Sequence, residues 1–331
     1  MRKIKWVLIV LAILFIVYLM GPSPSTPVYS TAMPAVPAEP AALVSYVSQQ
    51  EAAHKIKPDN EARVIWANDS LKNKTEYVLV YLHGFTASQG EGDPVHKDLA
   101  KKFGCNLYLS RLAEHGIDTT EPMVNLTSDN LWETAKQALA IGKQLGNKVI
   151  LVGTSTGGTL ALKLAAEYPD VYALLLMSPN IAINDPTAWI LNNHWGLQIA
   201  RMVTGSNYID SKDTRETFRK YWTYHYRIEA AVSLEELVET SMNKKTFERV
   251  KQPTLTLYYY KDNVHQDSTV KVSAIKEMFA QLGTPADKKR EVAMPNTGDH
   301  VIGSWIRSND LPGVERESER FMTEVLGMKE N

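Results

Sequence analysis

The hydrophobic pattern of the chain becomes regular from about residue 43. From there, short runs rich in β-branched and aromatic residues alternate with longer stretches whose apolar residues recur every three or four positions. The short runs are typical of strands, and several are almost entirely apolar, as parallel strands buried on both faces are. Strands are predicted at residues 63–66, 77–82, 106–109, 148–153, 172–177, 254–260 and 290–294, and helices at 94–102, 131–145, 156–168, 268–282 and 314–326. The alternation predicts an α/β fold with a mostly parallel central sheet and helices on both faces.

This alternation stops between about residues 181 and 251, where helix-like patterns continue but no convincing strand occurs. We interpret the segment as a helical cap inserted into the α/β domain. It is rich in aromatic residues: Trp189, Trp195, Tyr208, Phe218, Tyr221, Trp222, Tyr224 and Tyr226. These side chains could line an apolar substrate pocket beneath the cap, or they could form the core of the cap itself.

The first twenty residues differ from the rest of the chain. Arg2, Lys3 and Lys5 precede an uncharged apolar run at residues 6–20, and no Lys or Arg follows until Lys55. Such an asymmetry of basic residues predicts that the N-terminus is cytoplasmic. As a helix the run would span roughly 22 Å, a length between that of a signal-peptide core and that of a membrane crossing. We expect an uncleaved, single-pass membrane anchor with the body of the protein outside. The alternative is a signal peptide whose removal would release the same protein.

A proline-rich stretch follows at residues 21–42. Its prolines are Pro22, Pro24, Pro27, Pro34, Pro37 and Pro40. Such a composition predicts a semi-rigid spacer rather than a folded part. The expected organisation is therefore an N-terminal anchor or signal segment at 1–20, a linker at 21–42, and an α/β domain at 43–331 that carries the cap.

Charge and cysteine content exclude some classes of function. The 331 residues include 36 Lys and Arg and 37 Asp and Glu, so no strong field favours nucleic acid as a partner. Cys105 is the only cysteine, which excludes an intrachain disulfide and a cysteine-based metal site.

The sequence GTSTGG at residues 153–158 is the main chemical signal. It lies directly between the apolar run KVILV and the helical stretch TLALKLAAEY. A serine on such a tight strand-to-helix turn is lifted out of the sheet, and the small flanking residues let strand and helix approach closely. The pattern predicts a nucleophile elbow with Ser155 as the nucleophile.

A second signal, LHGFT at residues 82–86, ends the apolar run YVLVYL well upstream of the serine. Its position suits an oxyanion hole. The backbone N–H groups of Phe85 and of Thr156, the residue after the nucleophile, would then hold the oxyanion of a tetrahedral intermediate. The alternative is a strand that ends in an ordinary glycine turn.

A serine hydroxyl needs a base, usually a histidine that a carboxylate holds in the correct tautomer. With a serine elbow of this kind, the acid and then the histidine follow along the chain. His300 follows the last predicted strand and is the expected base, whereas His265 lies beside the candidate acids. Asp262 directly follows the run TLTLYYY and is preferred as the acid over Asp267.

The remaining histidines suggest structural roles. His83 is expected to brace the oxyanion loop by hydrogen bonds, and His115 to do similar work in another loop. No close group of His, Asp and Glu has the spacing of metal ligands on one helical face, so no metal is expected.

Together, LHGFTAS, GTSTGG, YYYKDNV and NTGDHV resemble the α/β-hydrolase superfamily, and the inserted cap resembles its esterase and monoacylglycerol-lipase branch. The resemblance covers about residues 62–327. It implies a triad of Ser155, Asp262 and His300 that works through an acyl-enzyme without a cofactor. The expected function is hydrolysis of a small-molecule carboxylic ester. The alternatives are an amide or peptide hydrolase with the same triad and a non-catalytic, membrane-tethered binding module.

Overall fold

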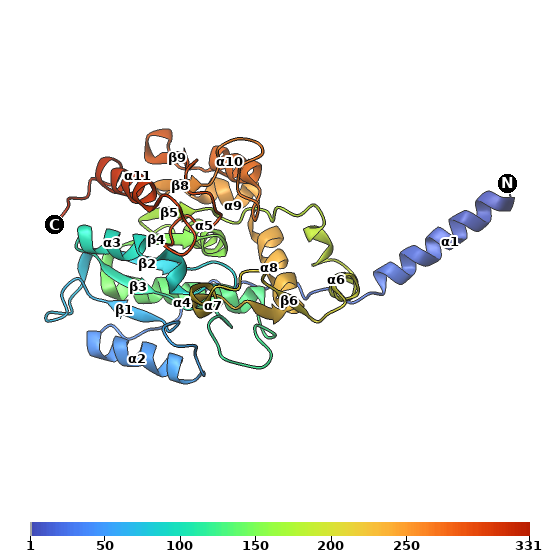
Figure 1. The fold of residues 1–331 in the computed structure, drawn as a ribbon, viewed down its shortest axis with the longest axis horizontal. Coiled ribbons are helices and arrows are strands. Elements are labelled where there is room, and N and C mark those ends of the chain that lie inside the picture. Colours follow the sequence, from blue (N-terminus) through green and yellow to red (C-terminus); the bar gives the residue numbers. More distant parts are fainter. Residues whose placement is uncertain (1) are drawn as a thin grey trace.

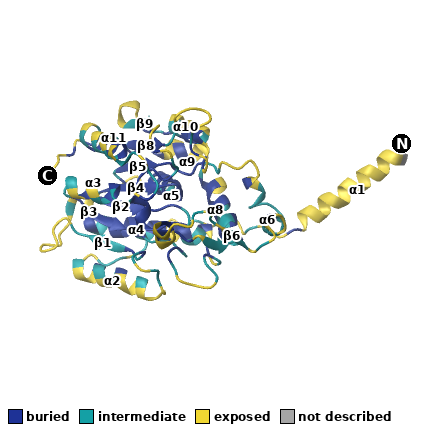
Figure 2. Ribbon diagram, viewed as in Figure 1, coloured by how far each residue is buried: buried dark blue, intermediate teal, exposed yellow. Residues whose placement is uncertain are grey.

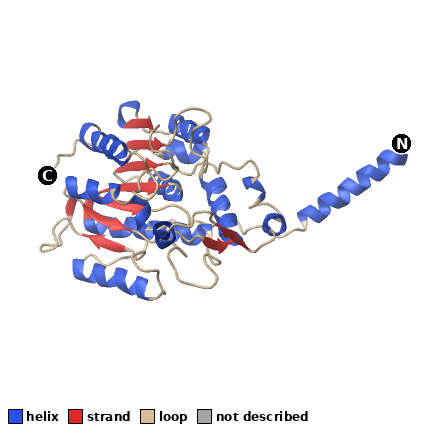
Figure 3. Ribbon diagram, viewed as in Figure 1, coloured by secondary structure: helices blue, strands red, loops and turns tan. Residues whose placement is uncertain are grey.

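A seven-stranded sheet forms the centre of the protein in the computed structural model, which describes residues 2–331 (Figures 1 and 3). Its strands, in spatial order, are β1 (Arg63–Ile65), β3 (Asn106–Leu109), β2 (Thr75–Leu82), β4 (Gly146–Thr154), β5 (Ala173–Met177), β8 (Thr254–Tyr258) and β9 (Lys289–Ala293). Only β1 runs antiparallel to its neighbour, and every other pairing in this sheet is parallel. All seven predicted strands and the predicted fold class are confirmed.

The five predicted helices are also present, with ends that agree within about one turn. They are α3 (Val95–Lys102), α4 (Ser128–Leu145), α5 (Thr156–Glu167), α10 (Val272–Gln281) and α11 (Leu311–Glu324). Short 3₁₀ turns, η1 (Gln89–Gly92) and η3 (Ala286–Lys288), occur in the connecting segments.

The central strands are apolar on both faces because helices cover both faces. Along β2, Val78, Val80 and Leu82 belong to the core beneath α4 and α5, whereas Leu79 and Tyr81 belong to the core beneath α3 and α11. All five side chains are fully buried, and the sheet is the most continuously buried part of the molecule in Figure 2. A sheet buried in this way exposes only its edges, so its polar chemistry gathers where the strands end.

The cap prediction needs one correction. The segment contains η2 (Ala188–Ile190), α6 (Gly196–Thr204), α7 (Glu216–Tyr221), α8 (Ile228–Ser241) and α9 (Lys244–Arg249), but also two antiparallel strands, β6 (Tyr208–Asp210) and β7 (His225–Arg227). Each of these strands has three residues, too few to produce a recognisable alternation of apolar and polar positions. The cap is therefore helical with a small two-stranded sheet.

The predicted membrane anchor is wrong. Residues 2–19 form the helix α1 (Arg2–Leu19), which extends away from the body (Figure 1). Within residues 2–331, no helix is both long and apolar enough to cross a membrane. The 18 residues of α1 include three basic residues near its start, and the apolar remainder is shorter than the roughly 30 Å of a hydrocarbon core. This finding contradicts the single-pass anchor and the location derived from it.

The proline-rich stretch does not stand apart from the body as a spacer would. The indole N–H of Trp132 donates to the carbonyl oxygen of Ser30 at 2.7 Å, and the ammonium of Lys136 donates to that of Ala32 at 2.9 Å. Both donors lie on α4 and their side chains are buried. Prolines leave carbonyl groups without a helix or sheet partner, and here the side chains of α4 bind those carbonyls. The interpretation as a semi-rigid spacer rather than a folded part is thus wrong for this part of the segment.

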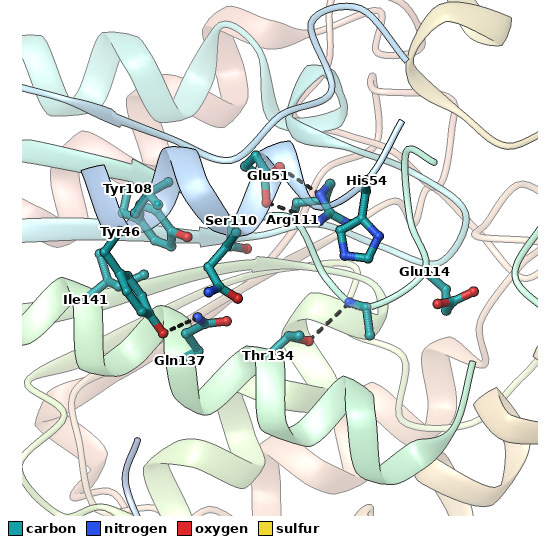
Figure 4. Close-up of a pocket in the computed structure, with 13 residues that line it drawn as sticks. Tyr46, Glu51, His54, Tyr108, Ser110, Arg111, Glu114, Thr134, Gln137 and Ile141 are labelled. Atoms are coloured by element: carbon teal, nitrogen blue, oxygen red, sulfur yellow. Dashed lines mark hydrogen bonds and ion pairs between the residues drawn. The ribbon is translucent and has the colours of Figure 1, made fainter. Parts of the chain in front are cut away.

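The next helix, α2 (Pro40–Ala52), is fixed by polar contacts around a small pocket (Figure 4). Glu51 forms a two-point ion pair with Arg111, with distances of 2.7 and 3.1 Å, and the hydroxyl of Tyr46 accepts from the amide of Gln137 at 2.7 Å. The side chains of Arg111 and Glu51 are only 7% and 12% exposed. Helix α2 is thus joined to the loop after β3 by a nearly buried ion pair.

We expect Arg111→Met to lower the free energy of unfolding by about 3–5 kcal/mol, because it leaves the carboxylate of Glu51 buried without its counter-charge. The double variant Glu51→Met/Arg111→Met should recover part of this loss, since no isolated charge remains. Urea denaturation of the three proteins measures both effects. A loss below about 1 kcal/mol in the single variant, as exposed ion pairs give, would contradict the prediction.

Candidate active site

Ser155 occupies a strained turn between β4 and α5. Its backbone has φ 52° and ψ −116°, a conformation that side-chain-bearing residues rarely adopt. The strain depends on neighbouring glycines. A Cβ at Gly157 would collide with the carbonyl oxygen of Leu82, and one at Gly153 would lie 2.5 Å from the carbonyl oxygen of Gly157. The first turn of α5 therefore lies directly against the ends of β2 and β4, with Ser155 at the carboxyl edge of the sheet.

The loop after β9 brings His300 to the same edge. The ring nitrogen Nδ1 of His300 donates to Oδ2 of Asp267 at 2.6 Å, and the two side chains are 10% and 0% exposed. Asp267 in turn accepts the backbone N–H groups of Thr269 and Val270 at 2.8 and 3.1 Å. A buried carboxylate with three donors is held in one orientation and fixes the imidazole ring with it.

The predicted acid, Asp262, does not reach His300. Its carboxylate accepts the backbone N–H groups of Val264 and His265 and contacts the ring of His265 at 3.0 Å, on the exposed turn after β8. The prediction that Asp262 orients His300 is therefore wrong in this structure.

A local turn explains the difference between the two acids. Tyr260 and Gln266 form an isolated bridge, and the N–H of Asp267 donates to the carbonyl oxygen of Tyr259 at 3.1 Å. The residues between them fold outward as a closed turn that carries Asp262. Asp267 consequently lies where a residue directly after the strand would be expected.

The electrostatics of the His300–Asp267 pair favour its charged form. Burial alone would raise the pKa of Asp267, but the charge and hydrogen bond of His300 and the two backbone donors outweigh it and lower the pKa. Burial alone would lower the pKa of His300, but the charge and hydrogen bond of Asp267, with smaller effects from Glu91 and Asp299, raise it. The imidazolium form of His300 is thus stabilised where it is buried.

The other ring nitrogen of His300, Nε2, is not hydrogen-bonded to the described chain. Nε2 is buried and has no hydrogen-bond partner among residues 2–331. The hydroxyl of Ser155 likewise makes no hydrogen bond to another group of the described chain, so none joins it to His300 here. Contacts between catalytic groups are often long before substrate binds. Nε2 is the nitrogen that remains to accept a proton.

The two predicted oxyanion donors lie on adjoining turns. Phe85 follows the end of β2, and Thr156 is the first residue of α5. Neither backbone N–H donates to another group of the described chain. Thr86 has a positive φ of 64°, and its carbonyl oxygen accepts the N–H of Thr223 from the cap at 2.7 Å. The loop after β2 is thus turned sharply and attached to the cap.

The hydrogen bonds predicted for His83 are present. It is fully buried, its Nδ1 lies 2.9 Å from the carbonyl oxygen of Gly84, and its Nε2 accepts the N–H of Leu112 at 3.0 Å. The ring of His115 packs on that of His83 with centroids 4.9 Å apart, and Nδ1 of His115 bonds to the carbonyl oxygen of Ala113 at 2.7 Å. Burial lowers the pKa of both histidines, which keeps them neutral.

Several cap aromatics form a core rather than an open pocket. Phe218 and Trp222 stack with ring centroids 4.9 Å apart. With Tyr221 they form a cluster that includes Val301 and Ile306 of the loop carrying His300. These side chains therefore join the cap to that loop.

Glu91 is not among the residues predicted from the sequence. This residue of η1 is only 2% exposed, and its carboxylate accepts the backbone N–H of Gly84 at 2.5 Å. The available signal was a carboxylate between two glycines, QGEG, shortly after the LHGFT motif. No group of three or more His, Cys, Asp or Glu within residues 2–331 is arranged to hold a metal ion.

Comparison with protein families identifies a match over most of the domain. The family model Hydrolase_4, described as serine aminopeptidase, S33, matches residues 73–294. No protein of curated function matches the chain by sequence.

Solved structures with low sequence identity share the fold. A structure of the metagenome-derived lipolytic enzymes LipS and LipT has 17% identity and a TM-score of 0.66, over 81% of this chain and 99% of that one. A soluble variant of monoglyceride lipase from Saccharomyces cerevisiae has 12% identity and a TM-score of 0.58, over 80% and 90%. Est1E from Butyrivibrio proteoclasticus with bound ferulic acid has 16% identity and a TM-score of 0.54, over 81% of this chain and 95% of that one. These likenesses confirm the α/β-hydrolase fold.

We expect Gly157→Ala to destabilise the protein by at least about 3 kcal/mol, because the added methyl group would overlap the backbone of Leu82. Gly205→Ala is the matched control. Unlike Gly157, Gly205 has a positive φ, of 64°, but a Cβ there meets no atom within 4 Å, so the cost should be only the roughly 1–2 kcal/mol of a left-handed residue. Thermal and urea denaturation measure both. Equal losses in the two variants would contradict the close approach at Gly157.

Proposed function

Since the chain belongs to the Hydrolase_4 family of α/β-hydrolases, we propose that it cleaves carboxylic esters through an acyl-enzyme formed on Ser155. Family membership makes the protein a hydrolase at the level of class. Beyond this class, we propose the identity of the nucleophile, the base and the ester substrate.

The hydrogen bond of 2.6 Å between Asp267 and His300 is the observation that carries the proposal. It fixes the tautomer in which Nδ1 is protonated and Nε2 can accept a proton. A buried, charge-stabilised imidazole with one free nitrogen, at the same sheet edge as a strained serine, is what activation of a hydroxyl requires. Asp267 takes the role that sequence inspection gave to Asp262.

In the proposed mechanism, Ser155 attacks the acyl carbonyl while Nε2 of His300 takes the hydroxyl proton. The N–H groups of Phe85 and Thr156 bind the oxyanion of the tetrahedral intermediate. His300 then protonates the leaving alcohol, and a water that it deprotonates releases the acid from Ser155. Asp267 stays ionised throughout and stabilises the imidazolium.

The description of the family as serine aminopeptidase gives a reason to consider amide hydrolysis by the same residues. The ester proposal has the support of structural relatives named as lipolytic enzymes and a monoglyceride lipase. Both reactions share the acyl-enzyme, so the leaving group distinguishes them. A non-catalytic binding protein would bind a ligand without labelling of Ser155.

We expect the full chain to react with a fluorophosphonate probe and to hydrolyse p-nitrophenyl esters, and we expect Ser155→Ala and His300→Ala to lose both activities. Parallel assays with amino acid p-nitroanilides test the amidase alternative. Labelling with turnover of anilides alone would replace the ester by an amide. A folded parent that neither labels nor turns over either substrate would falsify the catalytic proposal.

We expect Asp267→Asn to lower kcat by roughly 10³–10⁴-fold, because the wrong tautomer of His300 then faces Ser155. Asp262→Asn is the matched control, and it should leave kcat within about twofold since surface changes away from the site have small effects. Steady-state kinetics on the same ester measures both. The reverse order of effects would restore Asp262 as the acid.

A further inference from the structure

Glu91 is a buried carboxylate in direct contact with the loop after β2. Its Oε2 accepts the backbone N–H of Gly84 at 2.5 Å and the hydroxyl of Tyr81 at 3.2 Å. Gly84 leaves room for it, because a Cβ at that position would lie 2.5 Å from Oε1 of Glu91. Tyr81 also bonds to Thr154, the residue before the proposed nucleophile, at 3.1 Å. The carboxylate thus connects the loop after β2 to the end of β4.

Gly84 is held from both sides. Glu91 binds its N–H, and Nδ1 of His83 binds its carbonyl oxygen at 2.9 Å. That carbonyl belongs to the same planar peptide as the N–H of Phe85, and the two point in opposite directions in a trans peptide. Fixing the carbonyl therefore fixes the direction of the Phe85 N–H. Because Glu91 binds the N–H of Gly84, it prevents rotation of the peptide between His83 and Gly84. Such a rotation would change the backbone of Gly84 and with it the direction of the Phe85 N–H.

Glu91 also interacts electrostatically with His300. Its charge contributes to raising the pKa of His300, after Asp267, and the positive charge of His300 favours ionised Glu91 in return. Burial nevertheless raises the pKa of Glu91 to about 7, against the hydrogen bonds from Gly84 and Tyr81.

The other charges near His300 are already paired. Asp267, from the loop after β8, is bound to the ring itself. Asp299, from the same loop as His300, forms an ion pair with Arg307 at 2.9 Å. Glu91, by contrast, forms no ion pair with Lys or Arg among residues 2–331. Its charge therefore acts on His300 without a competing cation in contact.

We propose that Glu91 is a positioning residue that acts through Gly84 to hold the Phe85 N–H in the orientation needed to bind an oxyanion. The proposal rests on the ester hydrolysis proposed above. A carboxylate with a purely structural role would affect folding stability. It would neither lower kcat at unchanged KM nor change the pKa of His300. The two roles can therefore be separated.

The test compares Glu91→Ala and Glu91→Gln in the full chain. Glu91→Ala should lower kcat by roughly 100-fold with KM nearly unchanged, as for the loss of one oxyanion donor. Glu91→Gln keeps an acceptor for the Gly84 N–H, so its kcat should lie within about tenfold of that of the parent protein. The remaining loss is expected because a neutral hydrogen bond is weaker than a charge-assisted one.

The pH profile supplies a readout that a structural role would not move. His300 must be neutral to act as a base, so activity falls as the pH drops through its pKa. Removing the charge of Glu91 lowers that pKa, and the acid limb of kcat/KM in Glu91→Gln should move to lower pH. Glu235→Gln is the matched control, because Glu235 is also buried, in α8, and its pKa is also raised to about 7. It should change neither kcat nor the profile.

Two measurements need no turnover. NMR titration of His300 should show a lower pKa in Glu91→Gln, and hydrogen exchange at Gly84 should accelerate in Glu91→Ala. If both changes occur in a protein that neither labels nor hydrolyses esters, the proposed function fails while the positioning contact stands. An unchanged kcat in Glu91→Ala, or unchanged hydrogen exchange at Gly84 in that variant, overturns the role of Glu91.

Discussion

The close approach of α5 to the end of β2 is the constraint on which the candidate site depends. It is possible only because Gly157 has no side chain to meet the carbonyl oxygen of Leu82. The contact brings two segments together that are about seventy residues apart, the turn at Ser155 and the loop that begins at His83. It also explains the strained backbone of Ser155, because the chain must leave β4 and enter α5 within one residue. The same contact that strains the serine therefore sets it beside the proposed oxyanion donors.

A second constraint is the distribution of carboxylates around one buried histidine. Asp267 binds the ring of His300 directly, Glu91 acts on it from η1, and Asp299 is held by Arg307. Burial disfavours a charged imidazole, and these acids counter that cost. The arrangement suits a base that must become positively charged for part of a reaction cycle. The cap contributes through aromatic packing against the same loop, which keeps the histidine in place.

The support for the site extends beyond the part of the chain that the family model matches. The guanidinium of Arg111, paired with Glu51 of α2, also donates to the carbonyl oxygen of His115 at 3.3 Å. The ring of His115 packs on His83, which binds Gly84. A continuous series of contacts therefore links α2, which precedes the matched residues 73–294, to the loop after β2. In this protein α2 is therefore packed against the residues that support the candidate site.

The sequence by itself determined the seven sheet strands, the five helices predicted with them, and the positions of Ser155 directly after β4 and of His300 in the loop after β9. These features follow from local periodicity and from the polar residues that interrupt it, which can be read without knowing distant contacts. Only the tertiary structure showed that Asp267 rather than Asp262 bonds to His300, because this depends on a bridge between Tyr260 and Gln266 that folds the nearer carboxylate outward. It also decided the role open to Glu91, since burial against Gly84 arises from packing between segments and leaves no periodic trace. The short strands of the cap and the docking of the proline-rich segment depended on tertiary contacts for the same reason.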